Sequence, residues 1–292
     1  MEKTSYRLPA IVLPVVLLWG YYPTLLAMVQ KWASDPQYSH GFLVPLFSAY
    51  LIYRRCQLEA ELPSRSRGTD WAIPLGLSLL ALSAVLRVLG ALLYLQFFDA
   101  LSLLPCILGT ITLLGGQPWF ARSWAAVLFL FFMLPLPYRA ELFLGYPLQR
   151  IATISSTFLL QTLSFPAIAE GNTILLNEVK LGIAEQCSGL RMLMTFFAFS
   201  VATVLVIERS WLVKLFIIVS AVPIAIVTNI VRITGTGWAF MYVEGKQAQA
   251  LIHDVAGWLM MPLGLLLLLA ELWYLGRAII EEEKASPVLV RV

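Results

Sequence analysis

Long runs of apolar residues constrain this chain more than any other feature of its sequence. A transmembrane helix needs about 20 mainly apolar residues to cross the hydrocarbon layer. The sequence holds about eight such runs, although two are short: 8–29, 41–53, 71–94, 97–114, 123–136, 190–207, 211–231 and 255–275. Hydrophobic residues make up 60% of the chain and charged residues only 13%. We therefore expect an all-α polytopic protein of the lipid bilayer.

The basic residues predict how these spans are oriented. Loops rich in lysine and arginine stay in the cytoplasm. With eight spans and a cytoplasmic N-terminus, most of the 20 lysines and arginines fall on the cytoplasmic side. We expect both termini there, with one membrane domain over 1–276 and a short charged tail over 277–292. The loop 137–189 then faces outward.

The outer loop carries two patterns of its own. YPLQRIATISSTFLLQTLSF (146–165) mixes apolar and polar residues, which favours an amphipathic helix lying along the outer membrane surface. A ninth span there would reverse the second half of the chain and spoil the charge bias. The segment VKLGIAE alternates, and NTILL before it could be its partner strand with Asn177 and Glu178 as the turn, which predicts a small β-hairpin. The hairpin would lead the chain to Cys187.

The stretch EQCSGLR places Cys187 just before an apolar helix. Free amides and the positive dipole end at a helix N-terminus lower the pKa of a thiol and favour the reactive thiolate. Arg191 follows four residues later on the same face, where it would lower that pKa further or hold a substrate carbonyl. Ser188 and Gly189 are small enough to admit a substrate backbone and leave amides free as an oxyanion hole. The alternative is that Cys187 is a small buried residue.

Two more polar residues fall at the outer ends of spans. Arg232 in TNIVRITG runs against the charge bias, and ionisable residues near membrane depth are functional candidates, although an arginine at a span end also snorkels. His253 in LIHDVAGW is a candidate general base beside a thiol, although water could satisfy it instead. A nucleophile, a cation and a base on one side of the membrane match the logic of thiol acyl transfer.

The remaining polar residues have competing interpretations. His40 in YSHGF also falls outside, as a rival base, a substrate contact or a structural residue at a helix mouth. Arg87 lies inside the span 71–94, and Asp99 one helix later could pair with it in a structural role. No spacing of histidine and cysteine indicates a metal site, and no basic run with interleaved aromatics indicates nucleic acid. We expect no metal, no cofactor and no nucleic-acid partner.

The blocks EQCSGLR, NIVRITG and HDVAGW, in that order and at span ends, resemble the signature blocks of the exosortase/archaeosortase family. The early SHGFLVPLFSAYLIY and the lead-in EGNTILLNEVKLGIAEQCSGLR also resemble that family, so the similarity runs from about residue 38 to residue 258. The resemblance implies a multi-pass membrane cysteine protease or transpeptidase. It also implies that Cys187 is the nucleophile, Arg232 the family's cation and His253 the third member.

The resemblance also implies a substrate class. Such enzymes act on exported proteins with a C-terminal sorting signal of the PEP-CTERM type: a short Pro-Glu-Pro-like motif, an apolar helix and a basic cluster. The role is linked to protein sorting and exopolysaccharide-associated export. His253 in the third place suggests the bacterial branch, hence the bacterial inner membrane with an outward-facing site. A soluble domain that some relatives carry would have to come from a separate accessory protein.

Two other functions compete with this interpretation. A polytopic transporter or flippase for a polysaccharide or lipid precursor would suit eight spans, but the spans show no repeat symmetry and the charges gather at one surface. A membrane acyltransferase or glycosyltransferase would need a His-Asp pair or an acidic metal site, and neither is convincing in this sequence.

Overall fold

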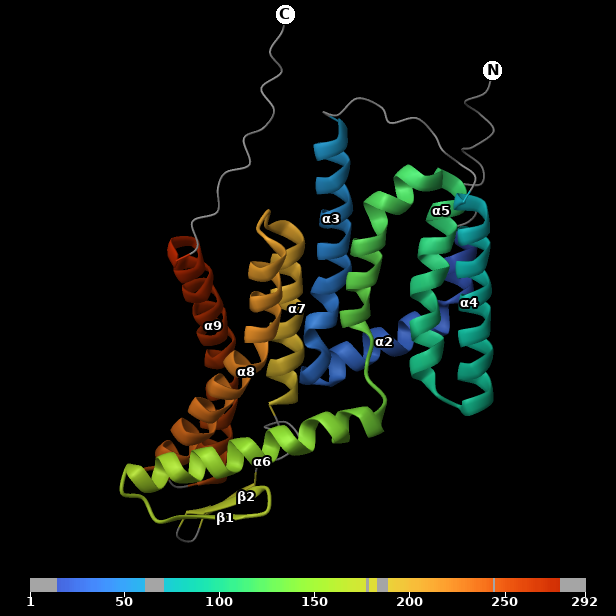
Figure 1. Cartoon of the computed structure of the whole chain (residues 1–292). Helices are drawn as coiled ribbons and strands as arrows, with labels where there is room; N and C mark the ends of the chain where they lie inside the picture. Colours follow the sequence, from blue (N-terminus) through green and yellow to red (C-terminus); the bar gives the residue numbers. More distant parts are fainter. Residues whose placement is uncertain (1–14, 61–70, 177–178, 183–188, 244, 279–292) are drawn as a thin grey trace, which may run out of the picture. The chain divides into compact units, whose positions relative to one another are not determined.

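The computed structural model describes residues 15–60, 71–176, 179–182, 189–243 and 245–278 (Figure 1). Its long helices are α2 (Tyr22–Ser34), α3 (Leu43–Ala60), α4 (Ala72–Leu93), α5 (Gln96–Phe129), α6 (Tyr138–Thr162), α7 (Leu190–Val206), α8 (Trp211–Phe240) and α9 (Lys246–Ala278). The short 3-10 helices are η1 (Pro36–Phe42) and η2 (Leu130–Met133), and the strands are β1 (Ala167–Glu170), β2 (Thr173–Leu176) and β3 (Val179–Gly182).

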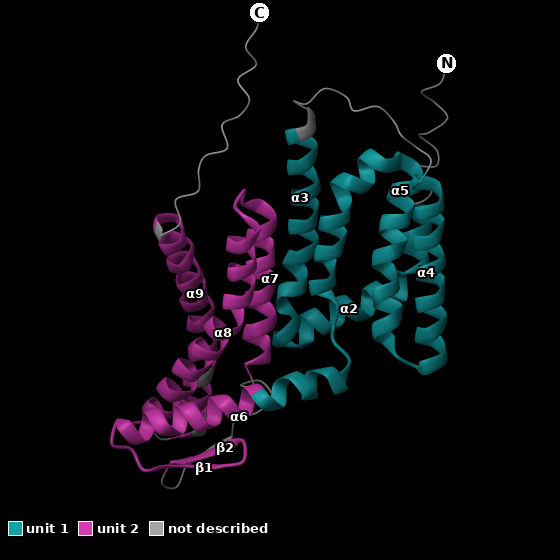
Figure 2. Cartoon of the chain, in the orientation of Figure 1, with its two compact units in different colours: residues 1–147 teal, residues 148–292 magenta. Residues whose placement is uncertain are grey.

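The chain divides into two compact units, residues 1–147 and 148–292 (Figure 2). Helix α6 begins in the first unit and ends in the second. The predicted single domain over 1–276 and the charged tail stay predictions, and the tail from residue 279 lies outside the described residues.

Four helices in the described part of the chain are long and apolar enough to cross a membrane, namely Ala72–Leu93, Gln96–Met133, Trp211–Phe240 and Gln247–Arg277. The shorter helix Leu190–Val206 is also apolar. The prediction of an all-α multi-pass membrane protein is confirmed. The total of eight spans and the cytoplasmic location of both termini stay predictions.

The predicted span 97–114 and the first part of 123–136 lie in one helix with a sharp bend, α5, and the second of these spans continues through η2. Gly116 interrupts α5 with φ 67 and ψ −161, a conformation that is open to glycine and strained for other residues. Figure 1 shows α5 bending over along its length. The first predicted span, 8–29, is partly outside the described residues, and its described part is helical at 15–20 but turns at Tyr21 before α2.

Helices α4 and α5 of the first unit approach each other through small residues. Gly76, Ser83 and Gly90 are spaced seven apart on α4, and all three are buried. A Cβ at Gly76 would lie 2.6 Å from Cγ of Leu113, and one at Gly90 would lie 2.9 Å from the backbone nitrogen of Asp99. Small residues let membrane helices pack closely where the hydrophobic effect gives no driving force between them. This spacing therefore specifies the α4–α5 pair.

A polar network joins the same two helices to the start of α2. Nε of Arg87 lies 3.3 Å from Oδ1 of Asp99, so the predicted ion pair is confirmed. The Arg87 guanidinium also lies over the ring of Tyr21, 4.5 Å from its centroid, and donates a hydrogen bond to the carbonyl of Gly20. Thr24 donates to the second carboxylate oxygen of Asp99. Arg87 therefore pairs with the Asp99 carboxylate and also contacts the turn at Tyr21.

In the second unit, α8 packs against both α7 and α9. Met192 and Phe196 of α7 and Ala221 and Ala225 of α8 form one buried cluster. Helix α9 reaches α7 at Gly264, where an added Cβ would overlap the ring of Phe196 at 1.8 Å. The three helices therefore form one closely packed bundle.

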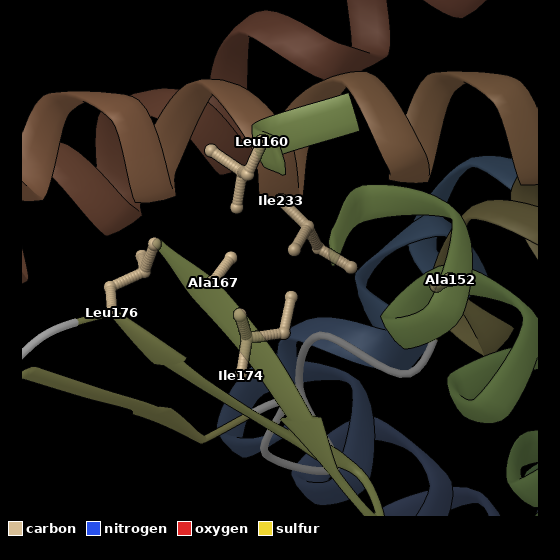
Figure 3. Packing of buried hydrophobic residues seen from close by; sticks show 6 residues of the cluster. All are labelled: Ala152, Leu160, Ala167, Ile174, Leu176 and Ile233. Carbon is tan, nitrogen blue, oxygen red and sulfur yellow. The ribbon is translucent and has the colours of Figure 1, made fainter. Parts of the chain in front are cut away.

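The strands form an antiparallel sheet in the order β1-β2-β3. Leu176 pairs with Val179 and Thr173 with Gly182, so the predicted hairpin is confirmed. The strand β1 was not predicted. The sheet packs on α6 and α8 through a buried apolar cluster (Figure 3): Ala152, Leu160, Ala167, Ile174, Leu176 and Ile233.

The part of α6 in the second unit is apolar on its exposed side. Ile151, Ile154 and Phe158 are exposed, whereas the buried side mixes Thr153 and Ser156 with Ala152 and Leu160 of the cluster. A helix of a water-soluble protein turns its apolar side inward. An outward apolar stripe instead suits a helix lying against lipid. The pattern supports the predicted interfacial helix.

Replacing Arg87 by methionine should destabilise the protein by about 1–2 kcal/mol, because the Asp99 carboxylate would lose its cation in apolar surroundings. The measurement is the midpoint of thermal unfolding in detergent, and adding Asp99→Asn to Arg87→Met should restore part of the loss. Arg150→Met is the control, since Arg150 is exposed on α6. Equal midpoints for Arg87→Met and Arg150→Met would contradict a stabilising role of the pair.

Candidate active site

Helix α7 begins at a glycine that the structure requires for two reasons. Gly189 is the N-cap residue and has a left-handed backbone, φ 78 and ψ −11, which glycine adopts without strain. A Cβ at Gly189 would also lie 3.0 Å from Nδ2 of Asn229. The side chain of Asn229 on α8 thus occupies the space that a side chain at position 189 would need. This contact fixes the start of α7 against α8, two residues after Cys187.

Helix α8 presents a buried polar face at this contact. Asn229 is 2% exposed and Arg232 is 4% exposed. Thr228 lies four residues before Arg232 and Thr236 lies four residues after it, so all three share one side of the helix. Both threonines are buried. A guanidinium in an apolar bundle is costly unless it is paired, and Arg232 and Asn229 both have interaction partners. The buried arginine therefore belongs to a built polar site.

The direction of the helices decides what else lies at this end of the second unit. Successive helices α7, α8 and α9 run in alternating directions (Figure 1). The start of α7, the second half of α8 and the start of α9 therefore share one end. The sheet and α6 pack there too, because a Cβ at Gly237 would meet both Leu160 and Leu176 at 3.2 Å. Ser156 of α6 donates to the carbonyl of Ile230 at 3.4 Å.

The predicted site residues are described to different extents. Arg191 lies in the first turn of α7, is half-buried and has an interaction partner. Its carbonyl accepts a hydrogen bond from Thr195 at 2.8 Å. Cys187 and Ser188 lie outside the described residues, and His253 belongs to α9 without a described side chain. Whether the thiol, the Arg232 guanidinium and the imidazole meet stays a prediction.

His40 lies in the first unit, in η1. Its Nε2 lies 3.1 Å from the carbonyl oxygen of Phe132, and burial lowers the pKa of His40 below its ordinary value. A neutral ring that donates Nε2–H to this carbonyl fits the structural interpretation. The neighbouring Tyr38 is 1% exposed, donates to Glu141 and accepts from the backbone of Leu136 at 3.0 Å. Contact of His40 with a substrate stays a prediction.

Asn229 and Thr228 are the residues that the sequence reasoning missed. Both stand in TNIVRITG, in an otherwise apolar stretch, and Asn229 precedes Arg232 by three residues. That spacing places two polar side chains on one helix face, which is a readable signal. Among the described residues, no group of three or more histidines, cysteines or acidic side chains could hold a metal ion.

The comparison with protein families decides the class of protein. The family model of the transmembrane exosortases matches residues 32–270. The chain belongs to the transmembrane exosortase family. The matched range includes Cys187, Arg232 and His253 of this exosortase. Neither a curated protein nor a solved structure matches the chain.

Gly189→Ala should destabilise the protein by about 2 kcal/mol, because a Cβ is strained at positive φ and would crowd the Asn229 carboxamide. The thermal unfolding midpoint of the purified protein measures this loss. Gly257→Ala on α9 is the matched control, since a Cβ there meets no atom within 4 Å, and it should leave the midpoint unchanged or raise it. Wild-type stability of Gly189→Ala would contradict the described contact.

Proposed function

We propose that this exosortase is a membrane-embedded cysteine transpeptidase or protease that cleaves C-terminal sorting signals of exported proteins. The site would face outward from the bacterial inner membrane. Membership of the transmembrane exosortase family supports the reaction class. The bilayer would hold the apolar helix of the signal, so that the enzyme and the cut site meet in two dimensions. Such confinement raises their effective concentration.

One structural observation carries the proposal. The buried Arg232 stands one helical turn from Asn229, and Asn229 contacts the residue that caps α7. Two residues of chain span at most about 7 Å, so covalent geometry keeps Cys187 within that distance of Gly189. A buried cation at a helix N-terminus next to a cysteine favours the thiolate. Ionisable residues at membrane depth are expensive and are retained where function needs them.

The proposed chemistry is acyl transfer to a thiol. His253 takes the proton of the Cys187 thiol, and the sulfur attacks the carbonyl carbon of the scissile peptide bond. Arg232 stabilises the negative charge that develops on the carbonyl oxygen, with Arg191 and the backbone amides around Ser188 and Gly189 in support. The carbon–nitrogen bond then breaks, His253 returns the proton to the leaving amine, and a thioester remains on Cys187.

An amine or a water molecule then resolves the thioester. The incoming nucleophile gives a proton to His253 and attacks the thioester carbon, and the sulfur leaves as the thiolate. An amine yields transfer to a new acceptor, whereas water yields hydrolysis. The C-terminal helix of the signal would have left with the amine in the first step.

Cys187→Ala should abolish processing of a co-expressed protein that bears a candidate C-terminal signal, because no other thiol can replace the nucleophile. The measurement is the substrate's mass or gel mobility, compared with the wild-type enzyme in the same membranes. Cys106→Ala is the matched control, since Cys106 is buried in α5 of the first unit, and it should process normally. Continued processing by a Cys187→Ala variant that inserts in the membrane would contradict the assignment of Cys187 as the nucleophile.

A further inference from the structure

Asn229 is an unusual side chain for its place in the molecule. It lies in α8, which is apolar over most of its length, and it is 2% exposed. A carboxamide has two N–H donors and one carbonyl acceptor. Burying such a group costs free energy unless it is hydrogen-bonded, so buried amides that persist have partners. Asn229 has an interaction partner, and its carboxamide lies next to the place that a Cβ at Gly189 would take.

The contact with Gly189 involves the carboxamide itself. An ideal Cβ at Gly189 would lie 3.0 Å from Nδ2, 3.4 Å from Cγ and 3.7 Å from Cβ of Asn229. The polar end of the side chain is therefore the part closest to the N-cap of α7. The left-handed backbone of Gly189 turns the chain into the helix at this point. The carboxamide lies against the residue whose conformation sets the path of the chain toward Cys187.

The same carboxamide stands next to the buried cation. Arg232 follows Asn229 by three residues and shares its helix face. One rigid helix thus carries both the group that contacts Gly189 and the guanidinium. A shift of Asn229 relative to Gly189 would change the distance between the start of α7 and Arg232. Misplacement of reacting groups by about 1 Å can cost about 100-fold in rate.

We propose that Asn229 is a positioning residue of the Cys187 site, whose buried carboxamide holds the N-cap of α7, and with it Cys187, in register with Arg232. The inference rests on the proposed function. Asn229 acts through Gly189 and does not itself touch the substrate. It keeps the backbone amides at the start of α7 preorganised for the charge that develops during acyl transfer.

The test uses the full-length enzyme with Cys56→Ser and Cys106→Ala, so that Cys187 is the one thiol left. Three quantities are measured in proteoliposomes: the rate of Cys187 alkylation by iodoacetamide, and kcat and KM for a signal-bearing substrate. The variants are Asn229→Ala and the isosteric Asn229→Asp. Ser200→Ala is the matched control, because Ser200 is a fully buried polar residue in the middle of α7, away from the contact with Asn229.

Both Asn229 variants should lower kcat by about 100-fold with KM nearly unchanged, and both should change the alkylation rate. Ser200→Ala should leave all three values close to those of the parent. Parent-like kcat and alkylation in both Asn229 variants would overturn the proposal. So would an equal loss in Ser200→Ala, or the failure of both Asn229 variants to fold, since either result would indicate a merely structural role.

The alkylation arm separates this proposal from the proposed function. Iodoacetamide reacts with Cys187 without any substrate, so the comparison of the Asn229 variants with Ser200→Ala holds even if the parent enzyme fails to process the signal. Absent processing with altered alkylation would refute the substrate class and leave the positioning role standing. Normal processing by the parent enzyme, with alkylation and kcat unaltered in the Asn229 variants, would refute the positioning role and leave the proposed function standing.

Discussion

The close approach of α7 and α8 at Gly189 and Asn229 is the contact on which the second unit's polar end depends. It requires a residue without a side chain on one helix and a buried carboxamide on the other. Because Arg232 stands on the same face as Asn229, the contact also sets where the buried cation lies relative to the start of α7. The sheet and α6 then pack over that end through an apolar cluster, which leaves a polar site inside an apolar protein.

The first unit handles its polar groups in a different way. Arg87 and Asp99 form an ion pair whose members also hold the backbone of Gly20 and the hydroxyl of Thr24. Glycines on α4 and α5 allow the close packing that brings these groups together. Both oxygens of the Asp99 carboxylate have partners in this network, which suits a structural role. The polar face around Arg232 instead lies beside a helix N-terminus, where a substrate carbonyl could bind.

Hydropathy was sufficient to predict the helical membrane class, and the period-two pattern of VKLGIAE was sufficient to predict the β2–β3 hairpin. The strand β1 escaped because AIAE is short and lacks a clear alternation, so only its pairing with β2 defines it. The bend at Gly116 could not be predicted, because it depends on the backbone angle φ of that residue, and amino-acid composition does not determine φ. The contact of Asn229 with Gly189 was not predicted, because the packing of α7 against α8 creates it and the local sequence pattern does not. The Arg87–Asp99 pair was predictable since two isolated opposite charges in apolar helices need each other.

The central claim is that Cys187 carries the acyl group of a cleaved sorting signal. The most direct measurement is mass spectrometry of the Cys187 peptide after rapid quenching of enzyme with a signal-bearing substrate. The account predicts an adduct on Cys187 with the mass of the substrate's N-terminal fragment, and neutral hydroxylamine should release it as expected for a thioester. An adduct on another residue, or cleaved substrate accumulating with Cys187 replaced by alanine, would contradict the account.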